Sequence, residues 1–206
     1  MSQAIELRCR CGEVHGVVSD VGSTTVSHGI CYCADCRAFA YFLERADILN
    51  SKGGTPIVQT APARVRFIQG AHHLRCMRLS EKGLLRWYAG CCNTPMGNMI
   101  SMRIPFVGLP RTCLENGIAG SGQTIAALLG KPNTIYARDA VGGQLPGEPP
   151  TASPRVALRA IKLMLGWWLK GLGKPSPYFD TTTRQPRTAP VVLTVTERER
   201  LRTVGG

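Results

Sequence analysis

The sequence predicts a mainly β fold with an appended C-terminal segment that contains a helix. Of the 206 residues, 44% are hydrophobic and 18% are charged, which is typical of a globular protein with one good core. The 23 glycines and 14 prolines indicate many turns and favour strands over a helical bundle. In the first half, apolar and polar residues alternate with the period of a half-buried strand.

Four short segments of the first half have the pattern of strands. Residues 5–9 and 63–67 alternate, and residues 73–79 and 84–88 flank a turn at 80–83. Between the first two, residues 34–49 hold good helix formers and neither glycine nor proline. We therefore expect a helix over 34–49, followed by a break at residues 53–56.

The second half differs in composition, because only Cys113 of the nine cysteines lies beyond residue 105. We divide the chain into a cysteine-rich β domain, residues 1–105, and a C-terminal extension, residues 106–206. Residues 142–154 are rich in glycine and proline and predict an exposed loop. Residues 181–206 are polar and basic, and we expect the end of the chain to fray.

A basic amphipathic helix is predicted over residues 155–170, with Ser153 as its N-cap and Pro154 at its start. Its polar positions fall within a stripe of about 80° and nearly all others are apolar. These polar positions are Arg155, Arg159, Lys162, Gly166 and Lys170. Docking on the β core or a homodimer contact is the favoured interpretation, and peripheral contact with a membrane surface is the alternative.

The nine cysteines indicate metal binding in a cytoplasmic protein. The first residues lack a basic region followed by an apolar stretch, so we expect no secretory signal. Cytosolic thiols stay reduced, which disfavours a disulfide framework and favours thiolate ligands for a metal. Cys113 is expected to pack in the core, and Cys76 either packs there or reaches a metal from its strand.

Seven cysteines gather in three tight groups and are the predicted Zn²⁺ ligands. They are Cys9 and Cys11, then Cys31, Cys33 and Cys36, and finally Cys91 and Cys92. The middle group supplies three thiolates, which leaves a fourth position for substrate and is the arrangement of a catalytic zinc. The first group supplies two, so a closed site needs the last pair, and both of its adjacent cysteines can serve only if the chain turns there. One or two zinc ions are therefore expected.

The formal charge of +12 predicts attraction to anionic partners. The basic residues are scattered singly, without a run of five or more. We therefore expect a solvated basic surface and no dedicated nucleic-acid site.

The cysteine motifs resemble those of the glutathione-dependent formaldehyde-activating enzyme (GFA)/centromere protein V family over residues 5–105. The shared elements are Cys-x-Cys-Gly at residue 9, Cys-x-Cys-x-x-Cys-Arg at residue 31, and a late Cys-Asn-Thr-Pro at residue 92. The resemblance implies a β-tent of packed antiparallel sheets with zinc knuckles. It also implies a structural zinc on the first and last pairs. On Cys31, Cys33 and Cys36 it implies an exposed zinc that joins formaldehyde to the glutathione thiol.

Two features depart from the family pattern. Ala89 stands where the family has a ligand cysteine, so either Cys91 replaces that ligand or the structural site has three thiolates. The segment after Arg37 looks helical, whereas the family has a glycine-containing stretch near its glutathione pocket.

Two functions follow from these motifs. The first is a carbon–sulfur lyase acting on adducts of a small thiol, such as glutathione, with formaldehyde, in which Arg37, Arg86 or His28 steers the anionic thiol. The alternative is a non-catalytic zinc scaffold for a protein, anionic or membrane partner. In the scaffold, a protein residue such as Cys76 or Cys91 fills the fourth zinc position.

Overall fold

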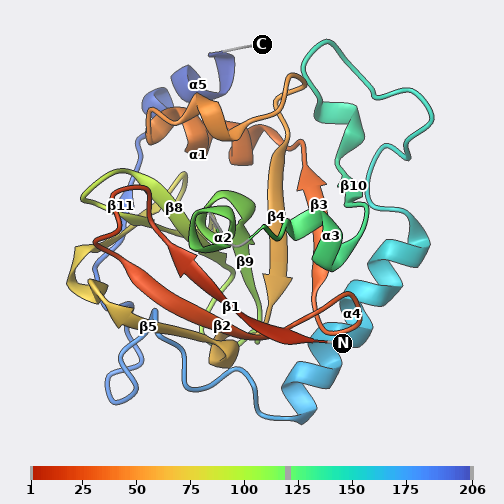
Figure 1. The fold of residues 1–206 in the computed structure, drawn as a ribbon. Coiled ribbons are helices and arrows are strands. Elements are labelled where there is room, and N and C mark those ends of the chain that lie inside the picture. Colours follow the sequence, from red (N-terminus) through yellow and green to blue (C-terminus); the bar gives the residue numbers. More distant parts are fainter. Residues whose placement is uncertain (1, 119–121, 205–206) are drawn as a thin grey trace.

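Two β-sheets form the fold in a computed structural model that describes residues 2–118 and 122–204 (Figure 1). The small sheet has the strand order β1-β2-β5 and the large sheet the order β10-β3-β4-β9-β8-β7-β6-β11. β10 and β11 pair in parallel at the two edges, and the other pairs are antiparallel. The strands are β1 (Gln3–Arg8), β2 (His15–Val21), β3 (Ser27–Cys31), β4 (Thr55–Thr60), β5 (Val65–Gln69), β6 (Leu74–Arg78), β7 (Leu85–Ala89), β8 (Thr94–Met99), β9 (Val107–Pro110), β10 (Asn133–Ile135) and β11 (Val191–Val192). The mainly β class predicted from the sequence is confirmed.

Helices pack against the sheets, and one of them, α2, contacts strands of both. They are α1 (Ala34–Phe42), α2 (Arg111–Ile118), α3 (Ile125–Leu129), α4 (Pro154–Leu169) and α5 (Val195–Thr203), with short 3₁₀ turns between some strands. α4 matches the helix predicted at 155–170 within one residue, and the Val156 amide donates to the Ser153 hydroxyl at 3.4 Å as the cap requires. Within residues 2–118 and 122–204, every helix is too short or too polar to cross a membrane.

The predicted helix over 34–49 is wrong in its second half. α1 ends at Phe42, Glu44 takes a left-handed φ of 55°, and a 3₁₀ turn follows at Ala46–Ile48. The turn brings the buried Arg45 inward, where its Nε donates to Asp47 at 2.7 Å and its Nη1 to the Thr94 hydroxyl at 3.4 Å. These tertiary contacts override the helix propensity of the segment.

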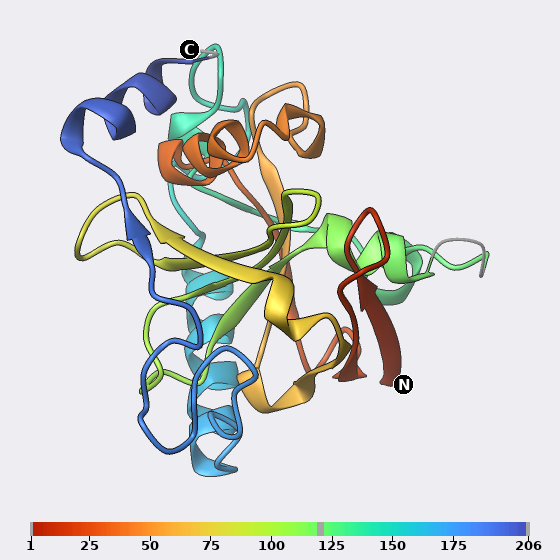
Figure 2. The same cartoon turned by 90° about the vertical axis from the view of Figure 1, so that its left-hand side faces the viewer.

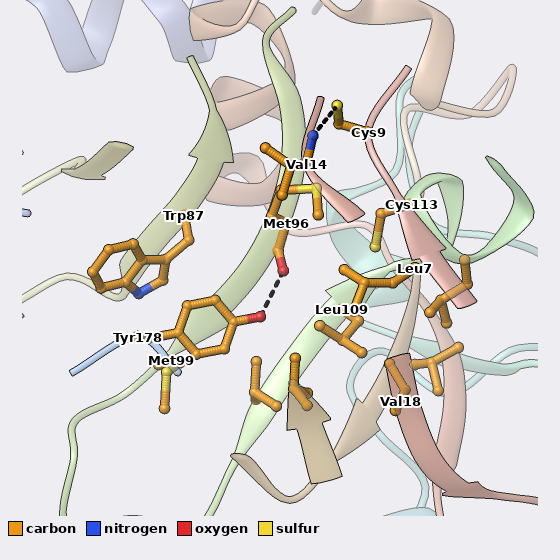
Figure 3. Packing of buried hydrophobic residues seen from close by; sticks show 14 of the residues in the cluster. Leu7, Cys9, Val14, Val18, Trp87, Met96, Met99, Leu109, Cys113 and Tyr178 are labelled. Carbon is orange, nitrogen blue, oxygen red and sulfur yellow. Dashed lines mark hydrogen bonds between the residues drawn. The ribbon is translucent and has the colours of Figure 1, made fainter. Parts of the chain in front are cut away.

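Residues on both sides of position 105 share one core. β9 lies inside the large sheet between β4 and β8, and Cys113 of α2 is fully buried. Tyr178 is also fully buried, packs against Trp87 with 5.4 Å between ring centroids, and donates its hydroxyl to the Met96 carbonyl at 2.8 Å (Figure 3). The extension from residue 106 therefore completes the sheet and core of the first hundred residues.

The C-terminal tail, expected to fray, instead forms β11 and α5. β11 pairs with β6, and α5 then packs beside α1 (Figure 2). α5 begins with a capping box, in which the Glu197 amide donates to the Thr194 hydroxyl at 3.3 Å and the Thr194 amide to the Glu197 carboxylate at 2.8 Å. Arg202, near its end, forms an ion pair with Asp35 of α1.

Candidate metal centres

The first and last cysteine pairs meet in one group of four. The Sγ atom of Cys11 lies 3.4 Å from that of Cys9 and 3.3 Å from that of Cys91. The Cys91 and Cys92 sulfurs are 3.9 Å apart, and all four lie within 4.8 Å of one another. Tetrahedral Zn–S bonds of about 2.3 Å place neighbouring sulfurs about 3.8 Å apart. The four sulfurs therefore fit one metal ion.

A tight turn after β1 aims the first two thiols at the same point. The Cys9 amide donates to the Val14 carbonyl at 2.9 Å, and the Gly12 amide returns to the Cys9 carbonyl at 3.1 Å. Gly12 has a φ of +86°, which a residue with a side chain rarely adopts. The Cys9 sulfur also accepts a hydrogen bond from the Val14 amide at 3.2 Å. The pair is thus placed by a turn, and not by the shared face of a strand.

The turn between β7 and β8 explains how two adjacent cysteines reach the same group. The amides of Cys92 and Asn93 both donate to the Ala89 carbonyl, at 3.2 and 2.8 Å, and Asn93 takes a left-handed φ of 54°. The chain therefore reverses where Cys91 and Cys92 stand, which brings both sulfurs to the same side. Ala89, which stands at the family's ligand position, is fully buried in β7, and Cys91 is the residue that joins the group of four thiols.

Burial and hydrogen bonds set the thiol acidities of this group. Burial raises the pKa of Cys9. Although burial also opposes ionisation of Cys92, hydrogen bonds from the Thr94 hydroxyl and the Cys11 amide lower its pKa to about 6. Thr94 in turn accepts from the Arg10 amide at 3.0 Å and from Arg45. Thr94 and Arg45 support the group, and no sequence motif identifies them in that role.

The middle three cysteines form a second group where β3 runs into α1. Cys31 is the last residue of β3, Cys33 is the N-cap of α1, and Cys36 lies in its first turn. The Cys31 and Cys33 sulfurs are 3.4 Å apart, and all three lie within 4.8 Å of one another. Within the described ranges, no further cysteine, histidine or carboxylate joins them. Cys76 is buried elsewhere in the core, where desolvation raises its pKa to about 12.

These three thiols line a cavity of about 500 Å³. Apolar side chains form much of its wall, namely Ile57, Leu84, Phe106 and Ile135. Its polar lining includes Asn98 and Arg86 from the large sheet and the Asp35–Arg202 ion pair contributed by α1 and α5. Any ion held by the three thiols would therefore keep a coordination position that a small molecule in this cavity can reach.

A buried arginine stands behind the three thiols. Arg86 is 2% exposed, and its Nη1 lies 4.0 Å from the Cys36 sulfur and 3.5 Å from Asn98 Oδ1. Its Nε has no hydrogen-bond partner among the described residues. Hydrogen bonds from Cys31 and Cys33, together with the Arg86 charge, hold the pKa of Cys36 well below its usual value. The hydrogen bonds that Cys31 gives to Cys33 and Cys36, with burial, raise the pKa of Cys31.

Of the three residues expected to steer a thiol, only Arg86 lines this cavity. Arg37 follows Cys36 in α1, but its Nη1 donates to the Asp139 carbonyl at 3.1 Å. His28 contacts the Gly130 carbonyl at 3.1 Å and lines a different cavity, with Lys131 and Arg155. Asn98 and Arg202 are cavity residues that sequence reasoning missed, because they follow no motif and come from distant segments.

The fold and its two thiol groups define a mainly β protein with two sites that can each hold a metal ion. The chain belongs to the family of unknown function DUF6151, whose profile matches residues 1–187. The comparison with curated proteins finds no match. Among solved structures, a crystal structure of a Rhodobacter sphaeroides protein is similar at 16% identity and a TM-score of 0.44. The similarity covers 64% of this chain and all of that one.

Proposed function

We propose that this protein binds two zinc ions, a structural ion on the group of four cysteines and an accessible ion on the group of three. The thiol-only donor sets and the sulfur separations support zinc over oxygen-preferring cations. Every cysteine is a free thiol in the structure, which suits the reducing cytoplasm expected for metal-binding thiols.

The observation that carries the functional proposal is the cavity beside Cys31, Cys33 and Cys36, where no fourth ligand comes from the described part of the chain. A closed site of this kind would be purely structural, whereas an open one is the arrangement of catalytic zinc. The scaffold alternative requires a filling residue such as Cys76 or Cys91. Cys76 lies in the core cluster and Cys91 belongs to the other group. This placement favours the catalytic proposal.

The reaction that we propose is the reversible addition of a small thiol to formaldehyde or a similar aldehyde, as in a carbon–sulfur lyase. Zinc on the three cysteines would act as a Lewis acid that stabilises the substrate thiol as its thiolate. The thiol loses its proton, its sulfur forms a bond to the carbonyl carbon, and the carbonyl oxygen becomes a hydroxyl by taking up a proton. The product is an S-hydroxymethyl thioether, and the reverse direction breaks the same carbon–sulfur bond.

The residues of the cavity suit such a substrate. Its volume of about 500 Å³ lies within the range of small-molecule sites. Ile57, Phe106 and Ile135 exclude water from the reacting atoms. Arg202 is already paired with Asp35, so Arg86 is the cation that would offset the thiolate charge and ease the approach of an anionic thiol such as glutathione. The resemblance of the cysteine motifs to the GFA/centromere protein V family supports the same substrate class.

Zinc content and adduct kinetics test this proposal together. Elemental analysis of the wild type should give two zinc ions per chain, and Cys33→Ser and Cys11→Ser should each retain one. Wild type and Cys33→Ser would then be mixed with glutathione and formaldehyde, and exchange between free and adduct forms measured by NMR. We expect acceleration by the wild type and none by Cys33→Ser. Two zinc ions without acceleration would reject the lyase and leave the metal sites, and fewer than two would reject the two-site proposal.

A further inference from the structure

An apolar stripe on α4 is exposed to solvent. The helix docks through Trp167, which is 4% exposed, and through the half-buried side chains around it. On another side it exposes Leu158, Ile161, Leu165, Trp168 and Leu169, each at 53% or more. At 100° per residue these five positions fall within an arc of about 100°. The helix itself lies at the edge of the molecule beside β3 (Figure 1).

Basic residues flank this stripe, and this stretch of the sequence carries no acidic residue. Lys162, Arg155 and Lys170 lie on the adjoining arc of the helix at exposed positions. Arg159 lies on the same arc but donates to the Ser23 and Val26 carbonyls, which fixes the helix on the body of the protein. The sequence contains no aspartate or glutamate from residue 149 to residue 179.

A basic pocket adjoins the C-terminal end of the stripe. Trp168 forms part of its wall, and its volume is about 590 Å³. Four cations line it, Arg78, Arg103, Lys174 and Arg184, together with apolar side chains such as Met102 and Phe179. Among residues 2–118 and 122–204, no carboxylate lines the pocket or forms an ion pair with any of these four cations.

We propose that α4 and this pocket form a docking surface for anionic phospholipid bilayers, independently of the metal sites. The exposed stripe would enter the boundary between headgroups and acyl chains, with Trp168 at the level where amphipathic rings gather. Lys162 and Lys170 would contact lipid phosphates, and the pocket cations would bind an anionic headgroup beside them. The chain would lie on the membrane surface without crossing it.

Charge complementarity favours a lipid surface over a second copy of this chain. A two-fold contact through the stripe would bring the basic residues of α4 close to those of its copy, and α4 has no carboxylate to offset the repulsion. An anionic bilayer neutralises the same charges and covers the apolar stripe at once.

Vesicle binding of the full-length protein tests this inference. The wild type would be mixed with vesicles of phosphatidylcholine alone or of phosphatidylcholine mixed with phosphatidylserine, and bound protein measured by sedimentation at low and high salt. We expect binding to the mixed vesicles that weakens with salt. Trp87 and Trp167 are buried, so a blue shift of tryptophan emission on binding should come from Trp168. The shift should be absent in Trp168→Phe, even at lipid concentrations high enough to saturate that variant.

Substitutions at exposed positions separate the apolar from the electrostatic contribution. Leu165→Glu should weaken binding at least tenfold, because it places a charge where an apolar side chain would be buried. Lys162→Gln should weaken it about fivefold. The matched controls, Ile68→Glu on β5 and Lys52→Gln in the turn before β4, change exposed residues outside this surface and should bind as the wild type does.

Three results would overturn the inference. They are the absence of binding to the mixed vesicles at low salt, unchanged binding by Leu165→Glu, and a dimer in solution that Leu165→Glu converts to a monomer while wild-type protein ignores vesicles. The last result would assign the stripe to a second copy of the chain.

Discussion

Replacing Arg86 by methionine should weaken zinc binding at the three-cysteine group and leave the four-cysteine group unchanged. Three thiolates with one Zn²⁺ carry a net charge of −1, and Arg86 is the buried cation that faces it, with Nη1 at 4.0 Å from the Cys36 sulfur. At that separation and an effective dielectric constant of about 20, the Coulomb attraction is about 4 kcal/mol. Part of this offsets the desolvation of the guanidinium. A loss of about 1.4–2.8 kcal/mol remains, which corresponds to a 10- to 100-fold weaker zinc affinity and is usual for residues behind metal ligands.

Competition with a chelator of known affinity measures this effect without reference to catalysis. In the wild type, chelator titration should release zinc in two classes, and in Arg86→Met only the class belonging to the three cysteines should shift. Arg86→Lys keeps the charge and should retain most of the affinity. Arg37→Met is the matched control, because Arg37 is likewise a buried arginine and follows Cys36 in α1, but its guanidinium contacts the Asp139 carbonyl. Equal zinc affinity in Arg86→Met and wild type would refute the electrostatic argument.

Three further predictions concern stability. Tyr178→Phe leaves the buried Met96 carbonyl without its hydroxyl donor and should lower the free energy of unfolding by about 1–2 kcal/mol. Urea denaturation measures this change, and an unchanged midpoint would contradict the assigned hydrogen bond. Burial lowers the pKa of His28, so the unfolded chain binds more protons than the folded one near pH 6. Stability should therefore fall as pH drops below about 6.5, and His28→Gln should flatten this slope in denaturation curves at several pH values. Chelation of all zinc should lower the melting temperature, and Cys11→Ser should reproduce most of that loss while Cys33→Ser should not. Calorimetry measures these melting temperatures, and a larger loss in Cys33→Ser than in Cys11→Ser would contradict the prediction.

The sequence predicted the elements whose signal is local. The helix at α4 carries its own cap at Ser153 and a clear amphipathic period, so its bounds differ from the prediction by one residue. The strands β6 and β7 flank a turn that composition alone indicates. The grouping of the cysteines was also visible, because it depends on spacing within a few residues.

Features that depend on contacts between distant segments were not predictable in the same way. α1 stops at Phe42, and the chain then turns so that Arg45 can hydrogen-bond to Thr94, a residue 49 positions away. Whether Cys91 and Cys92 reach one group depended on the reversal at Asn93, for which the sequence offered only a plausible turn. The lining of the three-cysteine cavity by Asn98 and Arg202 follows from sheet order and from the docking of α5, which no short motif encodes.

The group of four thiols joins the small sheet to the large one, and in the described part of the chain the two sheets share no strand. Cys9 leaves the small sheet at the end of β1, whereas Cys91 lies 82 residues further along, at a turn of the large sheet. An ion held by both would close a loop of that length in every unfolded conformation that retained the metal. By the chain-entropy relation for covalent cross-links, such closure disfavours the unfolded ensemble by about 4–5 kcal/mol. On this reasoning, the metal would act in this protein much as a disulfide does in a secreted one, as a cross-link that a reducing compartment does not break.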